Sequence, residues 1–136
     1  MRPNKWICGV AIVAAAVFGI SSVPAWAEGG PALPWKSPAT VTSGVPFHVA
    51  SIARCPAVPI PGDSVLVEIF LSFGPGGGSG DVLVANPDGS WSGTFTFFFS
   101  GVNIRQTTIT ATCLDFDGSS VQPYANYMSR HTQIFG

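Results

Sequence analysis

Apolar and polar residues alternate with a period of two along several short stretches of this chain. The clearest stretch covers 64–73 (SVLVEIFLSF), where one phase is apolar throughout: Val65, Val67, Ile69, Leu71 and Phe73. Neighbouring side chains of a β-strand point to opposite faces, so this pattern predicts a strand that buries one face. The opposite phase is mixed and contains Leu66, Glu68, Phe70 and Ser72. We therefore expect a central strand whose second face is partly covered as well.

The same alternation predicts strands over 45–55, 81–86, 91–99 and 105–114, with a closing strand over 124–135. The apolar phases of 45–55 and 105–114 include Cys55 and Cys113. In 91–99 the apolar phase holds Trp91, Gly93, Phe95, Phe97 and Phe99. Phe98 falls on the other phase, among threonines, so we expect its side chain to point away from the core.

Glycine and proline separate these stretches. Three prolines fall within 56–63, and the sequences Pro-Asp-Gly at 87–89 and Asp-Gly at 117–118 favour turns. The run GPGGGSG at 74–80 lacks the Lys and Ser/Thr of a phosphate-binding loop, so we expect a flexible hairpin connection there. No window shows the 3.6-residue period of a helix. Six or seven short strands with turns between them predict an all-β chain that folds as an antiparallel β-sandwich.

The first 27 residues have the layout of a secretory signal peptide. Arg2 and Lys5 precede an uncharged apolar run over 7–20, and Ala25-Trp26-Ala27 places small residues where a signal peptidase reads them. A run of about 14 residues is shorter than the roughly 20 that a membrane-spanning helix needs. We expect cleavage after Ala27. This divides the chain into a signal peptide (1–27), a Pro-rich leader (28–44) and one sandwich domain (45–136), and predicts a secreted or cell-surface protein.

The charge of the chain excludes two classes of partner. After removal of 1–27 the chain keeps four basic and seven acidic residues, a net charge of −3. Binding along a phosphate backbone needs several clustered cations, and the four that remain are scattered: Lys36, Arg54, Arg105 and Arg130. Nucleic acid and anionic membrane surfaces are therefore poor candidates as partners, and we expect no membrane insertion once the signal peptide is cleaved.

Two cysteines remain after export, Cys55 and Cys113. An even number in an exported chain predicts a disulfide, and two buried thiols are the alternative. The two cysteines lie far apart in sequence, which argues against a redox dithiol. In the chain-entropy description, closing a loop of this length stabilises the fold by about 4 kcal/mol.

Three motifs resemble those of a known family. SGVPFHVASIARC (43–55), DGSWSGTFTF (88–97) and TTITATC (107–113) are similar to strand motifs of bacterial Ig-like domains of the type found in secreted actinobacterial proteins. The resemblance covers about 45–113. It implies an Ig-like sandwich of about seven strands with one inter-strand disulfide, and an adhesive, spacing or binding role. Two features depart from antibody domains: 56–73 contains no Trp, and Ala111 stands where antibody domains carry a tyrosine.

Candidates for catalysis or metal binding are few. His48 and His131 are the only histidines, and no nucleophile-elbow motif accompanies them. Carboxylate and amide oxygens alternate in 86–90 and 115–119, yet neither segment completes a calcium-binding loop, so turn formation is the expected role. We expect no enzyme activity, no metal and no cofactor. A small hydrolase that uses one of the histidines is a remote alternative.

Binding is the function that these observations favour, through a partner in the cell envelope or another protein that the sequence does not identify. The contact would use the Phe98 face or the loops at one end of the sandwich. Phe98 is either covered by a loop or by the Pro-rich leader, or it anchors a protein contact, because an exposed aromatic ring loses little conformational freedom on binding. The alternative is a carbohydrate or small-ligand module with Trp35, Tyr124 and Tyr127 as stacking platforms. Trp35 has a second interpretation, in which the leader folds back and the indole packs onto the domain.

Overall fold

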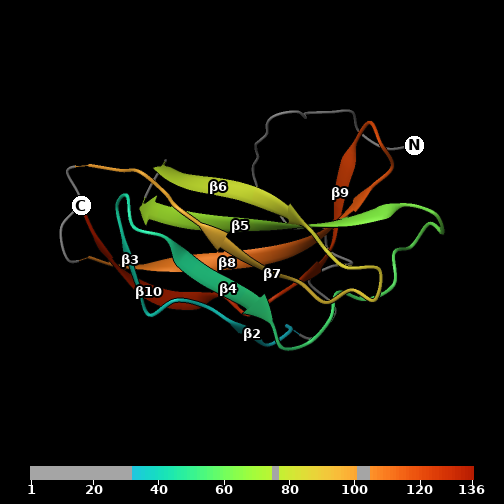
Figure 1. Cartoon of the computed structure of the whole chain (residues 1–136), viewed down its shortest axis with the longest axis horizontal. Helices are drawn as coiled ribbons and strands as arrows, with labels where there is room; N and C mark the ends of the chain where they lie inside the picture. The colour runs from blue at the N-terminus through green and yellow to red at the C-terminus, as the bar shows by residue number, and fades with distance from the viewer. Residues whose placement is uncertain (1–31, 75–76, 101–104) are drawn as a thin grey trace.

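The computed structural model describes residues 32–74, 77–100 and 105–136, and these residues contain strands, turns and loops but no helix (Figure 1). Nine strands lie in this part of the chain. They are β2 (Trp35–Lys36), β3 (Thr40–Thr42), β4 (Phe47–Ser51), β5 (Ser64–Gly74), β6 (Gly77–Val84), β7 (Ser92–Phe95), β8 (Arg105–Phe116), β9 (Val121–Asn126) and β10 (Arg130–Phe135). The predicted all-β class is confirmed.

The strands form two sheets that pack face to face. The larger sheet has the order β3-β10-β8-β5-β6, with β9 paired to β8 beside this path, and the smaller sheet has the order β2-β4-β7. Figure 1 shows β4 and β7 lying in front of β8 and β5. All pairs are antiparallel except β3 with β10, which run parallel.

This order is that of an Ig-like sandwich. In the lettering of such folds, β10, β8 and β5 correspond to strands G, F and C, β6 to the C′ strand of variable-type domains, and β4 and β7 to strands B and E. The predicted sandwich is thus confirmed, with nine strands in place of about seven. The extra strands come from the leader, which supplies β2 and β3, and from the predicted closing strand, which is divided into β9 and β10.

The core lies where the alternation placed it, between the inner faces of the sheets. Val67, Ile69 and Leu71 of β5 are completely buried. The inward phases of the neighbouring strands complete this layer with Phe47, Val49, Trp91, Phe95, Phe97, Ile109, Ala111 and Cys113. The apolar phase of the predicted strand 45–55 also placed Val45 in the core, and this prediction is wrong. Val45 is about half exposed, because β4 begins only at Phe47 and Val45 lies in the preceding turn.

The described part of the leader, 32–44, belongs to the sandwich. Trp35 and Lys36 pair with Ser51 and Ala50 of β4, and β3 then crosses to the other sheet to pair with β10. Trp35 is only 2% exposed, so the leader folds back with its indole inside the domain. The predicted signal peptide, 1–27, lies outside the described residues. No helix of a length and hydrophobicity that could span a bilayer occurs in 32–74, 77–100 or 105–136.

The glycine-rich run is not the flexible connection that we expected over 74–80. Gly77 to Gly80 open strand β6, which pairs with β5 from Gly77 to Val84. The strand forms because the ring of Phe70 on β5 lies across the glycines, as shown by the short approach of its ring atoms to the positions that side chains at Gly78 and Gly80 would occupy. A cross-strand aromatic ring supplies the cover that glycine lacks.

Two other boundaries also differ from prediction. Strand β4 ends at Ser51, so Cys55 lies in the following segment and not at the end of the strand itself. The closing strand is interrupted after Asn126, because Tyr127 and Met128 contact the leader there: the Met128 N–H donates to the Leu33 carbonyl at 2.8 Å. Both halves nevertheless pair with β8, β9 with its second half and β10 with its first.

Candidate functional site

Within the described residues, the outer face of β5 and β6 carries the largest group of exposed large apolar side chains that one pair of strands supplies. It consists of the outward residues Leu66, Glu68, Phe70, Val82 and Val84, which we call the β5–β6 face. Register places them together, since Leu66 is opposite Val84 and Glu68 is opposite Val82. Phe70 is 39% exposed, Val82 48% and Val84 71%.

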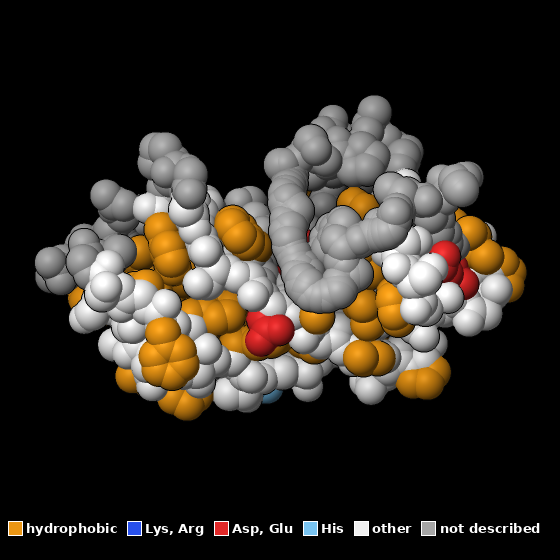
Figure 2. All heavy atoms as spheres, turned by 90° about the horizontal axis from the view of Figure 1, so that it is seen from above, with side chains coloured by type: hydrophobic (Ala, Val, Ile, Leu, Met, Phe, Trp, Pro, Cys, Tyr) orange, Lys and Arg blue, Asp and Glu red, His pale blue; other side chains and the backbone are white. Residues whose placement is uncertain are grey.

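Figure 2 views the molecule from above Figure 1, the side on which β6 lies. In this view hydrophobic side chains form several groups among polar side chains and backbone, and acidic side chains show at two places. A cluster of exposed apolar groups of this kind is more often a contact surface than an accident of folding.

Glycine residues of β6 lie beneath the Phe70 ring on this face. A Cβ atom at Gly78 would collide with Cζ of Phe70 and would come within 2.7 Å of the Leu71 carbonyl oxygen. At Gly80 it would lie 3.1 Å from Cδ1 of Phe70. The aromatic ring therefore lies over the glycines of β6, and the part of it that stays exposed is available to a partner.

Glu68 is the one ionisable side chain on the β5–β6 face. It lies between Leu66 and Phe70 along β5, and its register neighbours, Val82 on β6 and Thr112 on β8, carry no charge. The side chain is partly buried, and this desolvation raises the pKa of its carboxyl from 4.5 to about 7. No cation among the described residues pairs with it, so close to neutral pH it changes between a neutral and a charged form.

The edge of β6 that does not pair with β5 has one feature that opposes backbone pairing with another chain. The Asp81 carboxylate accepts a hydrogen bond from the backbone N–H of Val82 at 2.8 Å. Because an unpaired strand edge invites pairing with another chain, a charged side chain that occupies one of its donors reduces this tendency. The outer face of β6 is thus better suited to side-chain contacts than its edge is to backbone pairing.

Phe98 points outward, as its phase predicted, and it is 76% exposed. It follows β7 in a segment that runs beside the turn between β3 and β4. The Gly44 N–H donates to the Phe97 carbonyl, and the Phe99 N–H donates to the Ser43 hydroxyl. The ring of Phe98 lies over Gly44, and Val45, also exposed, is the next residue along the turn. Phe98 is therefore a second, smaller apolar surface.

The other three aromatic candidates lie inside the sandwich. Trp35, Tyr124 and Tyr127 are between 2% and 8% exposed. The Trp35 indole N–H donates to the Met128 carbonyl at 2.6 Å, and its ring packs against Trp91 and Tyr127. Rings in these positions have no free face on which a sugar could stack. The carbohydrate alternative therefore loses the platforms that the sequence suggested.

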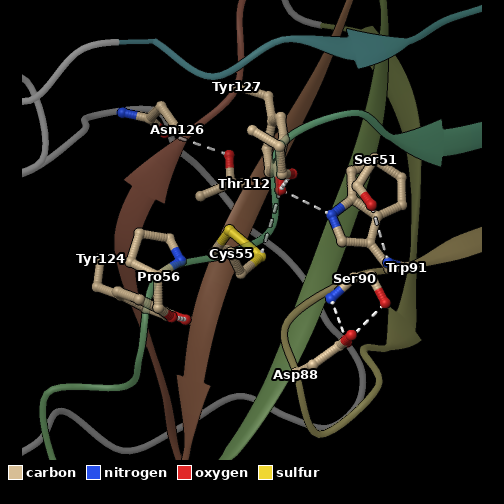
Figure 3. The surroundings of a disulfide bond; sticks show 12 residues. Ser51, Cys55, Pro56, Asp88, Ser90, Trp91, Thr112, Tyr124, Asn126 and Tyr127 are labelled. Carbon is tan, nitrogen blue, oxygen red and sulfur yellow. Dashed lines mark hydrogen bonds between the residues drawn. A yellow bond between two sulfur atoms is a disulfide. The ribbon is translucent and has the colours of Figure 1, made fainter.

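These tyrosines instead support the disulfide, which joins Cys55 to Cys113 with a Cα–Cα distance of 6.0 Å (Figure 3). The Tyr127 hydroxyl donates to the Ala53 carbonyl at 2.6 Å, and the Tyr124 hydroxyl donates to the Pro56 carbonyl at the same distance. The two hydroxyls thus fix the backbone on either side of Cys55. Burial raises the pKa of both phenols, that of Tyr124 to about 12 with a further contribution from the nearby Asp115 charge.

The histidines and the acidic turns do not converge on a site. His48 lies exposed on β4, beside Thr94, and His131 lies exposed on β10 in the other sheet. Asp88 and Asp117 each accept hydrogen bonds from the N–H and hydroxyl of the serine two residues later, which is turn chemistry. The Ser90 contacts lower the pKa of Asp88. In the parts of the chain that the structure describes, no three His, Cys, Asp or Glu side chains lie close enough to hold a metal ion.

The β5–β6 face is the feature that sequence reasoning missed. The mixed second phase of 64–73 was its only local signal, and that pattern also fits a covered strand. No protein-family model matches this chain, and no curated protein matches it in sequence. The candidate site therefore rests on geometry alone.

Proposed function

We propose that this chain is an exported Ig-like module that acts by binding another protein or a component of the cell envelope, and that the β5–β6 face is its contact surface. The observation that carries the proposal is the group of exposed side chains on one sheet face: Phe70, Val82 and Val84. A stable protein interface has an apolar centre around a few anchor residues, and an aromatic ring packed over the glycines of the neighbouring strand is such an anchor.

Export is part of the proposal, and two observations support it. The first 27 residues have the layout of a signal peptide, and Cys55 and Cys113 form a disulfide, a bond that persists in oxidising compartments. Binding without catalysis is supported by the separation of the two histidines, since acid–base or nucleophilic catalysis needs groups within hydrogen-bond reach of one another.

The experiment that tests the proposal uses the full chain, produced by export and oxidised, as bait for envelope and culture-medium proteins of the producing cell. Retained proteins are compared between the original chain and two variants with matched losses of apolar surface, Val82→Ser with Val84→Ser, and Phe98→Ser. All three positions are exposed, with Val82 48% exposed and the other two more so, and the fold should therefore survive each change.

We expect at least one protein that binds the original chain and the Phe98→Ser variant but not the Val82→Ser, Val84→Ser variant. Loss with Phe98→Ser alone would move the contact to the smaller surface that the sequence suggested. Equal retention of every protein by all three chains, and by a reduced and alkylated chain, would overturn a fold-dependent binding role.

A further inference from the structure

Glu68 has an unusual position for a carboxylate. Along its own strand it lies between Leu66 and Phe70, and across the strand pair it faces Val82. A partly buried charge without a counter-ion is unfavourable, because the apolar neighbours replace water that would otherwise solvate it. A binding partner that covered the face with apolar groups alone would increase this cost.

The charged groups near Glu68 are few. On β6 the one ionisable residue is Asp81, which lies opposite the buried Ile69, hence on the other face of the strand, and bonds to the Val82 N–H. On β8 the outward neighbours are Thr110, Thr112 and Leu114, none of which ionises. The local charge is therefore negative, and within the described residues nothing balances it.

We propose that the β5–β6 face binds a protein segment that presents one Lys or Arg side chain flanked by apolar side chains, with the cation paired to the Glu68 carboxylate. This inference rests on the proposed function and specifies the chemistry of the partner. Val82, Val84 and Phe70 surround the pair and exclude water from it, which strengthens a charge-assisted hydrogen bond.

A second copy of this chain fits the face less well. A symmetric contact through the same surface brings the two Glu68 side chains toward one another, and no cation on this face offsets that repulsion. Charge complementarity therefore favours a foreign segment over self-association while Glu68 is ionised.

The pairing also makes binding depend on pH. The raised pKa of Glu68 means that the free face is largely protonated below about pH 7, whereas the pair requires the ionised form. Affinity for a basic segment should rise by up to about tenfold per pH unit as the pH approaches 7 from below, and then level off.

The test uses a displayed library of random peptides of about 12 residues, selected near pH 7.5 on the oxidised full chain and counter-selected on the triple variant Phe70→Ser, Val82→Ser, Val84→Ser. Peptides that bind are measured by titration calorimetry against the original chain, Glu68→Gln and Phe98→Ser. Each is also synthesised with its basic residue replaced by Met. Thermal unfolding and disulfide content verify that every variant is folded.

We expect enrichment of peptides with one Lys or Arg between apolar residues. Glu68→Gln should weaken them about tenfold or more, Phe98→Ser should leave them unchanged, and the Met peptide should bind both chains alike, since the coupling between cation and carboxylate is then absent. If peptides do not bind the triple variant but bind Glu68→Gln as tightly as the original chain, the proposed cation pairing is wrong and the binding surface is still supported.

Three further results would be adverse. Peptides that depend on Phe98 would overturn both this inference and the assignment of the surface, but not a binding role. No enrichment of peptides over the triple variant would overturn the inference. A concentration-dependent dimer in light scattering that Val84→Ser abolishes would also overturn it, because a second copy of the chain would then occupy the face.

Discussion

The Trp91 indole donates its N–H to the Tyr127 hydroxyl at 2.9 Å, and the two rings meet edge to face with centroids 5.2 Å apart. The same hydroxyl donates its proton to the Ala53 carbonyl and lies 3.8 Å from the sulfur of Cys55. A single phenol oxygen thus joins the smaller sheet, the larger sheet and the segment that carries the disulfide. Buried polar groups of this kind define one arrangement of a core because each depends on the others.

Replacement of Tyr127 by Phe should destabilise the oxidised protein by about 2–3 kcal/mol, since both the Trp91 N–H and the Ala53 carbonyl lose their partner. Denaturant unfolding, followed by tryptophan fluorescence, measures this change. Tyr124→Phe is the matched control: it removes one hydrogen bond, to Pro56, and should cost only about 1 kcal/mol. Equal losses in the two variants would contradict the shared-hydroxyl role.

Gly78→Ala tests the packing of Phe70 over the glycines of β6. The new methyl group would meet the Phe70 ring and the backbone carbonyl of Leu71, and the carbonyl cannot move without breaking the pairing of β5 with β6. We expect a loss of about 1–3 kcal/mol in the free energy of unfolding. Gly77→Ala, where the nearest atom would be 3.6 Å away, should change stability by less than about 0.5 kcal/mol. Similar values for both would show that Phe70 does not lie over β6.

The glycines of β6 also show which part of the fold could not be predicted from the sequence. The alternation predicted the buried faces of β5, β7 and β8 because each strand contributes its own apolar phase, and it predicted the outward position of Phe98 for the same reason. The returning strand was predicted over 81–86, but the first half of β6, Gly77 to Gly80, was missed because its cover comes from Phe70, several residues away on another strand. Nothing within GPGGGSG itself signals a strand.

The predicted stacking platforms were wrong for a similar reason. Trp35, Tyr124 and Tyr127 are amphipathic, so the sequence allows either a surface platform or a core position. Their hydroxyl and indole groups are satisfied by carbonyls at Pro56, Ala53 and Met128, and such distant partners become visible only once the chain is folded. The β5–β6 face was missed because exposure of a second strand face depends on whether another layer covers it.

Glu68 should make the stability of the fold depend on pH. A carboxyl with a higher pKa in the folded chain than in the unfolded chain binds its proton more tightly when folded. Its contribution to stability is therefore fully present below about pH 4.5 and is lost as the pH rises to about 7. After allowance for partial solvent exposure, we expect a loss of about 1–3 kcal/mol between about pH 4.5 and pH 8.

The measurement is a series of urea unfolding curves across that pH range for the original chain and for Glu68→Gln. Other groups that titrate contribute equally to both proteins, so the difference between the two curves isolates Glu68. Glu68→Gln should be the more stable protein near pH 8. A difference that does not change with pH would mean that Glu68 is solvated in the folded chain.

Thr132→Val should stabilise the protein, which is unusual for a change in a core. Thr132 on β10 is 1% exposed, and its hydroxyl has no hydrogen-bond partner among the described residues. It lies opposite Thr107 on β8, whose hydroxyl donates to the Ser72 carbonyl. Valine has nearly the shape of threonine, so Thr132→Val removes an unpaired buried hydroxyl and should add about 1 kcal/mol, whereas Thr107→Val breaks a bond and should cost about as much.

Differential scanning calorimetry separates the two variants by the sign of the change in Tm. For a domain of this size about 1 kcal/mol corresponds to several degrees, well above the error of the measurement. Because Thr132 and Thr107 are neighbours on one sheet face, general effects of a valine on strand stability are shared by both. A fall in Tm for Thr132→Val comparable to that for Thr107→Val would mean that the Thr132 hydroxyl has a partner in solution, such as a buried water molecule.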